Sequence, residues 1–238
     1  MNMDIDQPIE DKDLFKAAET GDSSTFKALS PEQLSKSLFL RNEDDRSLLH
    51  VAASSGHSEV VKILLSVDES KNVVNAVDEE GWAPIHSAAS IGNAEIVEIL
   101  SSKGADVNLK NDGGRTALHY AASKGWLRIA ELLISHGAKI NSKDKVGCTP
   151  LHRGASTGNS EVCEFLIEEG AVVDATDKAG QTPLMNAVIC HNKEVALLLI
   201  RHGADVDVED KEGYTVLGRA SNDFRSILVD AAKAMLEG

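Results

Sequence analysis

The chain has 238 residues and a formal net charge of −14, with 38 acidic against 24 basic side chains and no basic stripe. A protein that neutralises phosphate groups needs clustered Lys and Arg, so this balance argues against nucleic acid and anionic membrane surfaces as direct ligands. The three cysteines have no CxxC spacing, and no apolar run approaches the ~18 residues of a membrane span. We therefore expect reduced thiols and a soluble protein inside a cell.

In chain order, an acidic segment precedes the first helical unit. Residues 1–12 read MNMDIDQPIEDK, contain no apolar signal-peptide run, and are predicted to form a disordered acidic tail. The stretch DLFKAAETGDSSTFKAL, which starts at Asp13, predicts two short helices separated at a glycine. We place Phe15 and Lys16 at the positions that Leu and His hold in the later units, which makes this first unit a polar one.

From Ser47 onward one pattern recurs along the chain. Four near-copies read SLLHVAASSG, APIHSAASIG, TALHYAASKG and TPLHRGASTG. The copies, with two more divergent ones, begin at Ser47, Ala83, Thr116, Thr149, Thr182 and Thr215. The first spacing is 36 residues and every later one is 33. A marker such as GADVN follows each of the four central copies, and a D-x-x-G stretch such as DKVG precedes most copies, so this is a true internal repeat.

Each copy predicts two helices followed by a turn. The Ser or Thr that opens a copy is a good N-cap, and Pro150 and Pro183 follow at the first helical position, where a missing N–H costs nothing. A glycine such as Gly125 or Gly158 ends this helix. A second helix with apolar residues at i, i+3 and i+4 follows and ends at another glycine. The D-x-x-G stretch then predicts a turn that projects before the next copy.

This unit of 33 residues, with its T-P-L-H-x-A core, resembles the ankyrin-repeat family from Asp13 to the C-terminus. The resemblance implies an all-α fold, an ankyrin-repeat solenoid of about seven helix-turn-helix repeats with projecting β-turn tips. We expect a single domain over residues 13–238, with polar repeats that cap both ends because an uncapped solenoid exposes an apolar face. Residues 66–77 contain the three additional residues and are expected to form a lengthened loop.

The copies align four histidines, which raises the question of a metal or catalytic site. They are His50, His86, His119 and His152. Equivalent side chains on stacked helices lie roughly 8–10 Å apart, whereas zinc ligands lie about 2.0–2.3 Å from one ion. The row cannot converge on a metal, and the ankyrin resemblance implies that each His bonds backbone groups that tie neighbouring turns together. We expect no metal ligand and no cofactor.

The cysteines and the absence of catalytic motifs also argue against an enzyme. Cys163 falls on the apolar face of EVCEFLI and is expected in the core, whereas Cys148 and Cys190 are expected where repeats face outward. Neither has a pattern of cationic neighbours that would activate a thiolate. The sequence contains no GxSxG, P-loop, HExxH or GxGxxG motif, so we predict no catalytic residue.

The candidate binding surface consists of the turn tips and the exposed side of the first helices, which line one concave face in ankyrin arrays. The predicted partner-binding residues are Glu43, Asp44, Arg46, Glu79, Glu80, Trp82, Asp112, Arg115, Lys124, Lys145, Arg153, Lys178, Lys211 and Tyr214. The tips begin acidic and become basic from about the fourth repeat, and Trp82 is a large aromatic at a turn. Aromatic residues and Arg at such places are typical of interaction hot spots, although a solvated face without a partner can also carry such charges.

A closer resemblance rests on the GWAPIHSAAS turn, the TALHYAASKG repeat, the Arg in TPLHRGAS and the ending MLEG. These features are similar to the ankyrin-only assembly chaperones of the proteasome regulatory particle (the non-ATPase regulatory subunit 10 family). That resemblance implies a cytoplasmic and nuclear monomer that binds the C-terminal helical domain of a proteasomal AAA ATPase while the regulatory-particle base is assembled. The Leu-x-Cys-x-Glu peptide of some members is absent, so their pocket-protein partner is not expected.

Two other classes of binding protein stay open at this point. An IκB-type inhibitor of a transcription factor is also acidic and built from ankyrin repeats, but it would be expected to carry a DSGxxS degron and long flanking tails, and the sequence shows neither. A general ankyrin scaffold in signalling is the other alternative, because ankyrin repeats bind many kinds of protein and the fold alone does not fix the function.

Overall fold

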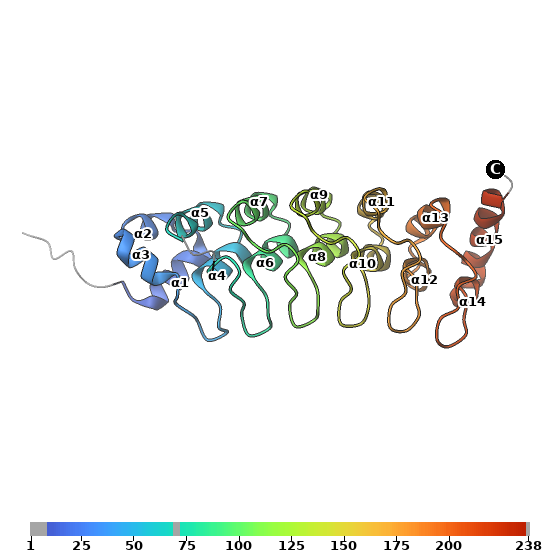
Figure 1. Cartoon of the computed structure of the whole chain (residues 1–238), viewed down its shortest axis with the longest axis horizontal. Helices are drawn as coiled ribbons and strands as arrows, with labels where there is room; N and C mark the ends of the chain where they lie inside the picture. Colours follow the sequence, from blue (N-terminus) through green and yellow to red (C-terminus); the bar gives the residue numbers. More distant parts are fainter. Residues whose placement is uncertain (1–8, 69–71, 237–238) are drawn as a thin grey trace, which may run out of the picture. The chain divides into compact units, whose positions relative to one another are not determined.

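The computed structural model of the chain describes residues 9–68 and 72–236. Contacts within the chain cluster into two compact units, unit 1 up to Asp106 and unit 2 from Val107 onward. Every regular element of the described residues is a helix, which confirms the predicted all-α ankyrin fold (Figure 1). None of these helices is both long enough and apolar enough to span a membrane.

Unit 1 consists of paired helices with a turn between one pair and the next. Its helices are α1 (Asp11–Thr20), α2 (Ser23–Lys27), α3 (Pro31–Ser37), α4 (Leu48–Ser54), α5 (Ser58–Ser66), α6 (Pro84–Ile91) and α7 (Ala94–Ser102). The pairs α1–α2, α4–α5 and α6–α7 are the predicted ones. Helix α3 is an addition that the repeat pattern does not predict. It begins with a capping box, in which the Ser30 hydroxyl accepts the Gln33 N–H at 3.2 Å and Gln33 Oε1 accepts the Ser30 N–H at 2.9 Å.

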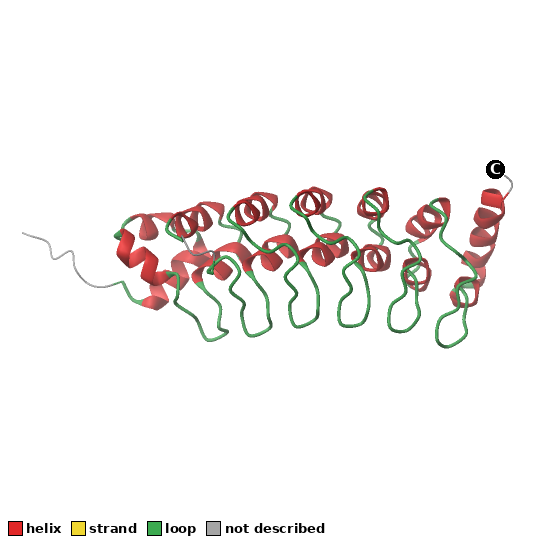
Figure 2. Cartoon of the chain, viewed as in Figure 1, coloured by secondary structure: helices red, strands yellow, loops and turns green. Residues whose placement is uncertain are grey.

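Unit 2 repeats the same helix pair four times. Its helices are α8 (Ala117–Lys124), α9 (Leu127–Ser135), α10 (Pro150–Thr157), α11 (Ser160–Glu168), α12 (Pro183–Ile189), α13 (Lys193–Arg201), α14 (Val216–Arg219) and α15 (Asn222–Leu236). Within unit 2 the first helices pack side by side, α8 against α10 and α10 against α12. In both units the loops that precede the first helices project away from the second helices (Figure 2).

The sequence determines both ends of each first helix, as α10 illustrates. Thr149 Oγ1 accepts the His152 N–H at 3.4 Å and caps the start. Gly158 ends the helix with a left-handed φ of 79°. A Cβ on this glycine would also lie 2.9 Å from Oδ1 of Asn192, whose side chain donates to the Ala155 carbonyl at 2.9 Å. Glycine is therefore needed at this position both for its backbone conformation and for the close approach of the following repeat.

In the core of unit 2, a larger side chain on α11 is matched by a smaller residue on its partner helix α10. Cys163 is fully buried, as predicted, and a Cβ on Gly154 would lie 2.9 Å from its Sγ. In the preceding repeat, 33 residues earlier, the same two positions are Ala121 and Ala130, and both are fully buried. The larger residue at 163 is thus accommodated by the loss of a methyl group at 154, because protein interiors are packed too densely to leave room for both.

The aligned histidines have the structural role that the sequence predicts. His119 Nδ1 accepts the Thr116 N–H at 3.1 Å, and its Nε2 lies 3.1 Å from the Cys148 carbonyl in the following turn. His152 and His50 make the equivalent bonds, with Nε2 at 3.1 and 2.9 Å from a carbonyl of the following turn. Because Nδ1 accepts a hydrogen bond from a backbone N–H, Nδ1 carries no proton. The ring proton is therefore on Nε2, which donates a hydrogen bond to the carbonyl. Each imidazole therefore joins the start of its own helix to the next turn.

Burial keeps these imidazoles neutral. It lowers the pKa of His50 and of His119 to about 4, and it lowers the pKa of His152 as well. In none of the described residues do three or more His, Cys, Asp or Glu side chains form a group that could hold a metal ion.

The first repeat differs from the prediction in two details. Helix α1 begins inside the predicted tail of residues 1–12; residues 1–8 lie outside the described part, where the tail stays a prediction. Leu14, and not Phe15, is the buried residue at the Leu position. The left-handed Gly21, equivalent to the glycine after α4, sets this register, so Phe15 takes the place of the histidine. The predicted alignment was wrong by one residue.

Two expectations about organisation remain open. The lengthened loop predicted for residues 66–77 contains no helix after the end of α5 among its described residues, and residues 69–71 lie outside them. The single domain predicted for residues 13–238 stays a prediction, since contacts cluster the chain into the two units given above.

We predict that His119→Ala lowers the free energy of unfolding by about 1–3 kcal/mol at pH 7, because a buried N–H and a buried carbonyl lose their partner. The pKa of His119 in the fold lies below its ordinary value, so its contribution is present above pH 6.5 and is lost as the pH falls towards 4. The variant should therefore lose less stability than the wild type between pH 7 and pH 5. Denaturant titrations at both pH values measure this, and an unchanged stability with the same pH dependence would contradict the structural role.

The C-terminal helix is predicted to act as a cap. Phe224 and Leu228 of α15 are fully buried, and α15 packs against α13. Deleting the chain from Asn222 onward exposes the apolar side of α13 and should cause partial unfolding or aggregation. Thermal unfolding and size-exclusion chromatography measure the effect. A soluble truncated chain that melts at the temperature of the full chain would show that α15 is not a cap.

Candidate functional site

Each projecting turn is closed by an aspartate or asparagine side chain, which is buried at Asn111, Asp144 and Asp210. In the turn at Asp144, Oδ1 accepts the N–H of Val146 at 3.0 Å and that of Cys148 at 2.9 Å, while the Asp144 N–H donates to the Cys148 carbonyl at 2.9 Å. Gly147 has a φ of 86°, and a Cβ there would lie 2.8 Å from the backbone nitrogen of Lys178. The D-x-x-G pattern therefore specifies the shape of the turn.

Backbone bonds between neighbouring turns align three predicted lysines in unit 2. The N–H groups of Lys145, Lys178 and Lys211 each donate at 2.9 Å to a carbonyl of the preceding turn. All three side chains are exposed and occupy the same position of their turns, the one after the aspartate. The structure therefore brings these lysines into one row. Asp112 occupies the same position in the first turn of unit 2 and is also exposed, so the charge changes sign within this unit.

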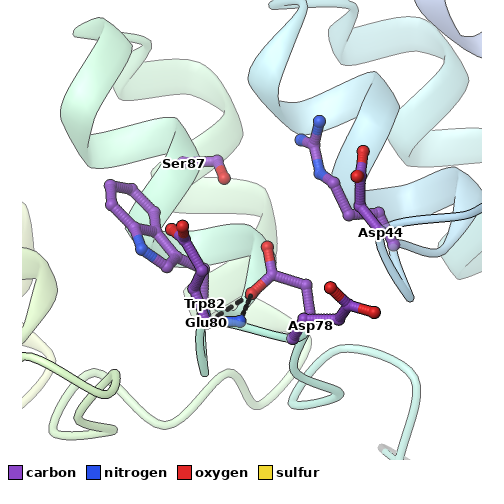
Figure 3. A pocket seen from close by; sticks show the side chains of 7 residues that line it. Asp44, Asp78, Glu80, Trp82 and Ser87 are labelled. Atoms are coloured by element: carbon purple, nitrogen blue, oxygen red, sulfur yellow. Dashed lines mark hydrogen bonds between the residues drawn. The ribbon is translucent and has the colours of Figure 1, made fainter.

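In unit 1 the predicted tips form an acidic pocket of about 350 Å³ (Figure 3). Its lining residues are Asp44, Arg46, Asp78, Glu79, Glu80, Trp82 and Ser87. Five of the predicted partner-binding residues thus meet in one place, from two neighbouring turns that share a backbone bond, Glu79 N–H to the Asp44 carbonyl at 3.4 Å. The sequence did not single out Asp78 or Ser87. A wider hollow of about 1000 Å³ includes Glu43 and Phe15 and shares Asp44 and Arg46 with this pocket.

Two predicted residues of the pocket are more constrained than expected. Trp82, expected to be exposed, is half-buried, and its ring meets His86 edge-on with centroids 6.1 Å apart. Arg46 donates from Nη2 to the His50 carbonyl at 3.1 Å and to Ser54 Oγ at 2.7 Å. Arg46 is therefore held against its own helix, and the carboxylates dominate the charge of the pocket.

In unit 2, Arg153 is engaged inside the chain. Its Nε donates to Asp144 Oδ2 at 3.1 Å, and its Nη2 binds the same oxygen. Asp144 is only 6% exposed. Burial alone would raise the pKa of Asp144, but the hydrogen bond and charge of Arg153 outweigh it and hold the pKa below its usual value. Arg115 lies farther away, with its Nε 3.8 Å from the same oxygen, and its side chain is more exposed than that of Arg153.

The last turn has the same arrangement with an aromatic ring added. Arg219 Nε donates to Asp210 Oδ2 at 2.7 Å, and the guanidinium lies over the ring of Tyr214, 4.4 Å from its centroid. Tyr214, a predicted binding residue, is exposed. The sequence reading missed both Arg–Asp pairs. The signal that identifies them is the common separation of nine residues, from 144 to 153 and from 210 to 219.

The remaining predicted residues lie as follows. Lys124 is exposed at the end of α8. Cys148 does not face outward as predicted: it is 7% exposed because the turn folds its side chain inward, and burial raises the pKa of its thiol to about 11. Burial raises the pKa of the Cys163 thiol to about 12, and Cys190 is exposed, as predicted. The two buried thiols are therefore protonated at neutral pH and unreactive.

Comparison with known families supports the fold and the kind of function. "Ankyrin repeats (3 copies)" matches residues 14–111 and 104–177, and "Ankyrin repeats (many copies)" matches residues 166–220. A comparison with curated proteins gave no match. Ankyrin repeats generally serve as non-enzymatic scaffolds that bind other proteins, and the exposed charged turns agree with such a binding role. The chain belongs to the ankyrin-repeat family of protein-binding scaffolds.

Proposed function

We propose that this protein is an assembly chaperone of the proteasome regulatory particle, similar to gankyrin. In this role it binds the C-terminal helical domain of one proteasomal AAA ATPase through its turns and first helices, and it leaves before the particle is complete. The resemblance of the Trp82 turn, the TALHYAASKG repeat and the Arg153 helix supports the proposal. Such a protein would work in the cytoplasm and the nucleus as a monomer.

The observation that carries this proposal is the charge of the turns. Unit 1 presents a pocket with four carboxylates and one guanidinium that is bound internally. Unit 2 presents the aligned row of Lys145, Lys178 and Lys211. Two patches of opposite sign fix the orientation of an elongated helical domain, which one patch of uniform charge would not do. Complementarity of this kind contributes chiefly to specificity and to the rate of association.

An IκB-type inhibitor or a general signalling scaffold would use the same surface with a different partner. The proposal is therefore tested by the identity of the partner together with the location of its contacts. The partner should carry Lys and Arg where it meets unit 1, and Asp and Glu where it meets the lysine row of unit 2.

We predict that reversing two charges at the acidic tip, with Glu79→Lys and Glu80→Lys, weakens binding to the ATPase domain by at least about tenfold. The matched control reverses Glu168 and Glu169, which are also exposed but lie at the end of the second helix α11. Calorimetric titration with the C-terminal domains of the regulatory-particle ATPases, one at a time, measures both variants. Equal affinities of the two reversed proteins would contradict binding at the turns.

Binding should also weaken as salt is raised, because charges at the edge of an interface are screened over a Debye length of about 8–10 Å.

Trp82→Ala should cost a further ~1–3 kcal/mol of binding free energy, as expected for an aromatic hot spot. Because Trp82 also packs on His86, thermal unfolding of the variant must be compared with that of the wild type. An affinity that is independent of salt and of Trp82 in a folded variant would rule out this surface.

A further inference from the structure

Two turns of unit 2 bind an arginine of the chain itself, and a turn of unit 1 has a similar site without such an arginine. In two turns of unit 2, an arginine nine residues after the turn aspartate binds that carboxylate: Arg153 on Asp144, and Arg219 on Asp210. In both, Oδ1 closes the turn by accepting two backbone N–H groups, and Oδ2 receives the guanidinium. The second carboxylate oxygen of a turn aspartate is therefore a place where this fold holds an arginine.

In the last turn an aromatic residue completes the arginine site. Tyr214 lies four residues after Asp210, and the guanidinium of Arg219 lies 4.4 Å above the centre of its ring. The guanidinium thus contacts a carboxylate with its N–H groups and lies over an aromatic ring. Both contacts suit arginine, which is planar, forked and weakly hydrated, better than they suit lysine.

The turn at Asp78 has the same carboxylate and an aromatic ring at the same separation, but no arginine of its own. Trp82 stands four residues after Asp78, and Ser87 stands nine residues after it, where Arg219 stands in the last turn. Asp78 Oδ1 accepts the N–H of Glu80 at 3.1 Å and of Trp82 at 2.8 Å, as in the turns that hold an arginine.

The second oxygen of Asp78 faces the acidic pocket described above. None of the hydrogen bonds and ion pairs among the described residues involves this oxygen. In Figure 3 the carboxylate of Asp78 lies between Trp82 and Asp44, with Ser87 above it. Ser87 thus stands where the other two turns have arginine, and a pocket of about 350 Å³ lined by three further carboxylates lies beside the carboxylate of Asp78.

We propose that the pocket formed by Asp78, Trp82 and Ser87 binds an arginine side chain of the protein partner. The guanidinium donates to the second oxygen of Asp78 and packs beside the indole, as Arg219 does on Asp210 and Tyr214. The inference rests on the proposed function, in which the partner docks on the turns of unit 1, and it names the residue type that the partner presents there. Arginine is selected over lysine because only a guanidinium offers both the fork and the flat face.

The test uses the full chain and two probes, N-acetyl-arginine amide and N-acetyl-lysine amide, at the same ionic strength. The NMR signals of the two indole N–H groups report binding, with Trp126 of unit 2 as the reference. Three variants accompany the wild type. Asp78→Asn removes the acceptor charge, and Ser87→Arg supplies the missing arginine from within the chain. Asn186→Arg, the control, places an arginine nine residues after Asp177, in a turn that has Gln181 in place of the aromatic.

We expect the arginine probe to shift the Trp82 signal. Its affinity, measured from this shift, should be at least about fivefold higher than that of the lysine probe. Asp78→Asn should lower the arginine affinity by at least about fivefold. Ser87→Arg should abolish the response and move the Trp82 signal towards its bound position, whereas Asn186→Arg should respond like the wild type. Equal responses to both probes, or an unchanged response in folded Asp78→Asn, would overturn the arginine pocket.

The same proteins separate this inference from the proposed function. If the arginine probe binds as expected but none of the ATPase domains binds the wild-type chain, the pocket stands and the proposed partner is wrong. If an ATPase domain binds the wild type and the probes are not distinguished, the function stands and the arginine pocket is wrong. If both hold, Ser87→Arg should lower the affinity of the chain for the ATPase domain by at least about tenfold, and Asn186→Arg should leave that affinity unchanged.

Discussion

The hydrogen bond from a buried histidine to the carbonyl of the following turn is the interaction on which the rest of each unit depends. In unit 2, His119 joins the start of α8 to the Cys148 carbonyl, and His152 repeats the bond 33 residues later. Because the imidazole is buried and neutral, it fixes the turn relative to the helices without introducing a charge into the core. The turns can then hold side chains at constant positions, which a flexible loop could not do.

The aspartates that close the turns at positions 78, 144 and 210 give these fixed positions their chemistry. One carboxylate oxygen closes the turn, and the other either binds an arginine of the chain or faces the surface. At Asp144 and Asp210 the charge is used internally. At Asp78 it contributes to an acidic pocket beside Trp82. The same local structure therefore stabilises the fold where an arginine stands nine positions later, and we propose that it recognises a partner at Asp78, where a serine stands instead.

The sequence predicts the fold well because the repeat fixes caps, glycines and histidines together. Thr149 and Gly158 define α10 from local chemistry alone, and repetition makes the same assignment several times. The prediction is wrong where the pattern is degenerate: the first repeat lacks the histidine, so Phe15 was placed one residue out of register. It is also wrong for Cys148, whose burial depends on how the turn folds back. The pairing of Arg153 with Asp144 was missed because the separation of nine residues gains its meaning only when the folded turn brings the two side chains together.

We propose that the charged turns bind a proteasomal ATPase before the regulatory particle is complete. Affinity purification of the chain from cells, followed by cross-linking and mass spectrometry, tests it most directly. We expect the purified material to contain regulatory-particle ATPases without core-particle subunits, with cross-links from Lys145, Lys178 or Lys211 to the C-terminal domain of one ATPase. Purification without any ATPase, or cross-links confined to the second helices, would contradict it.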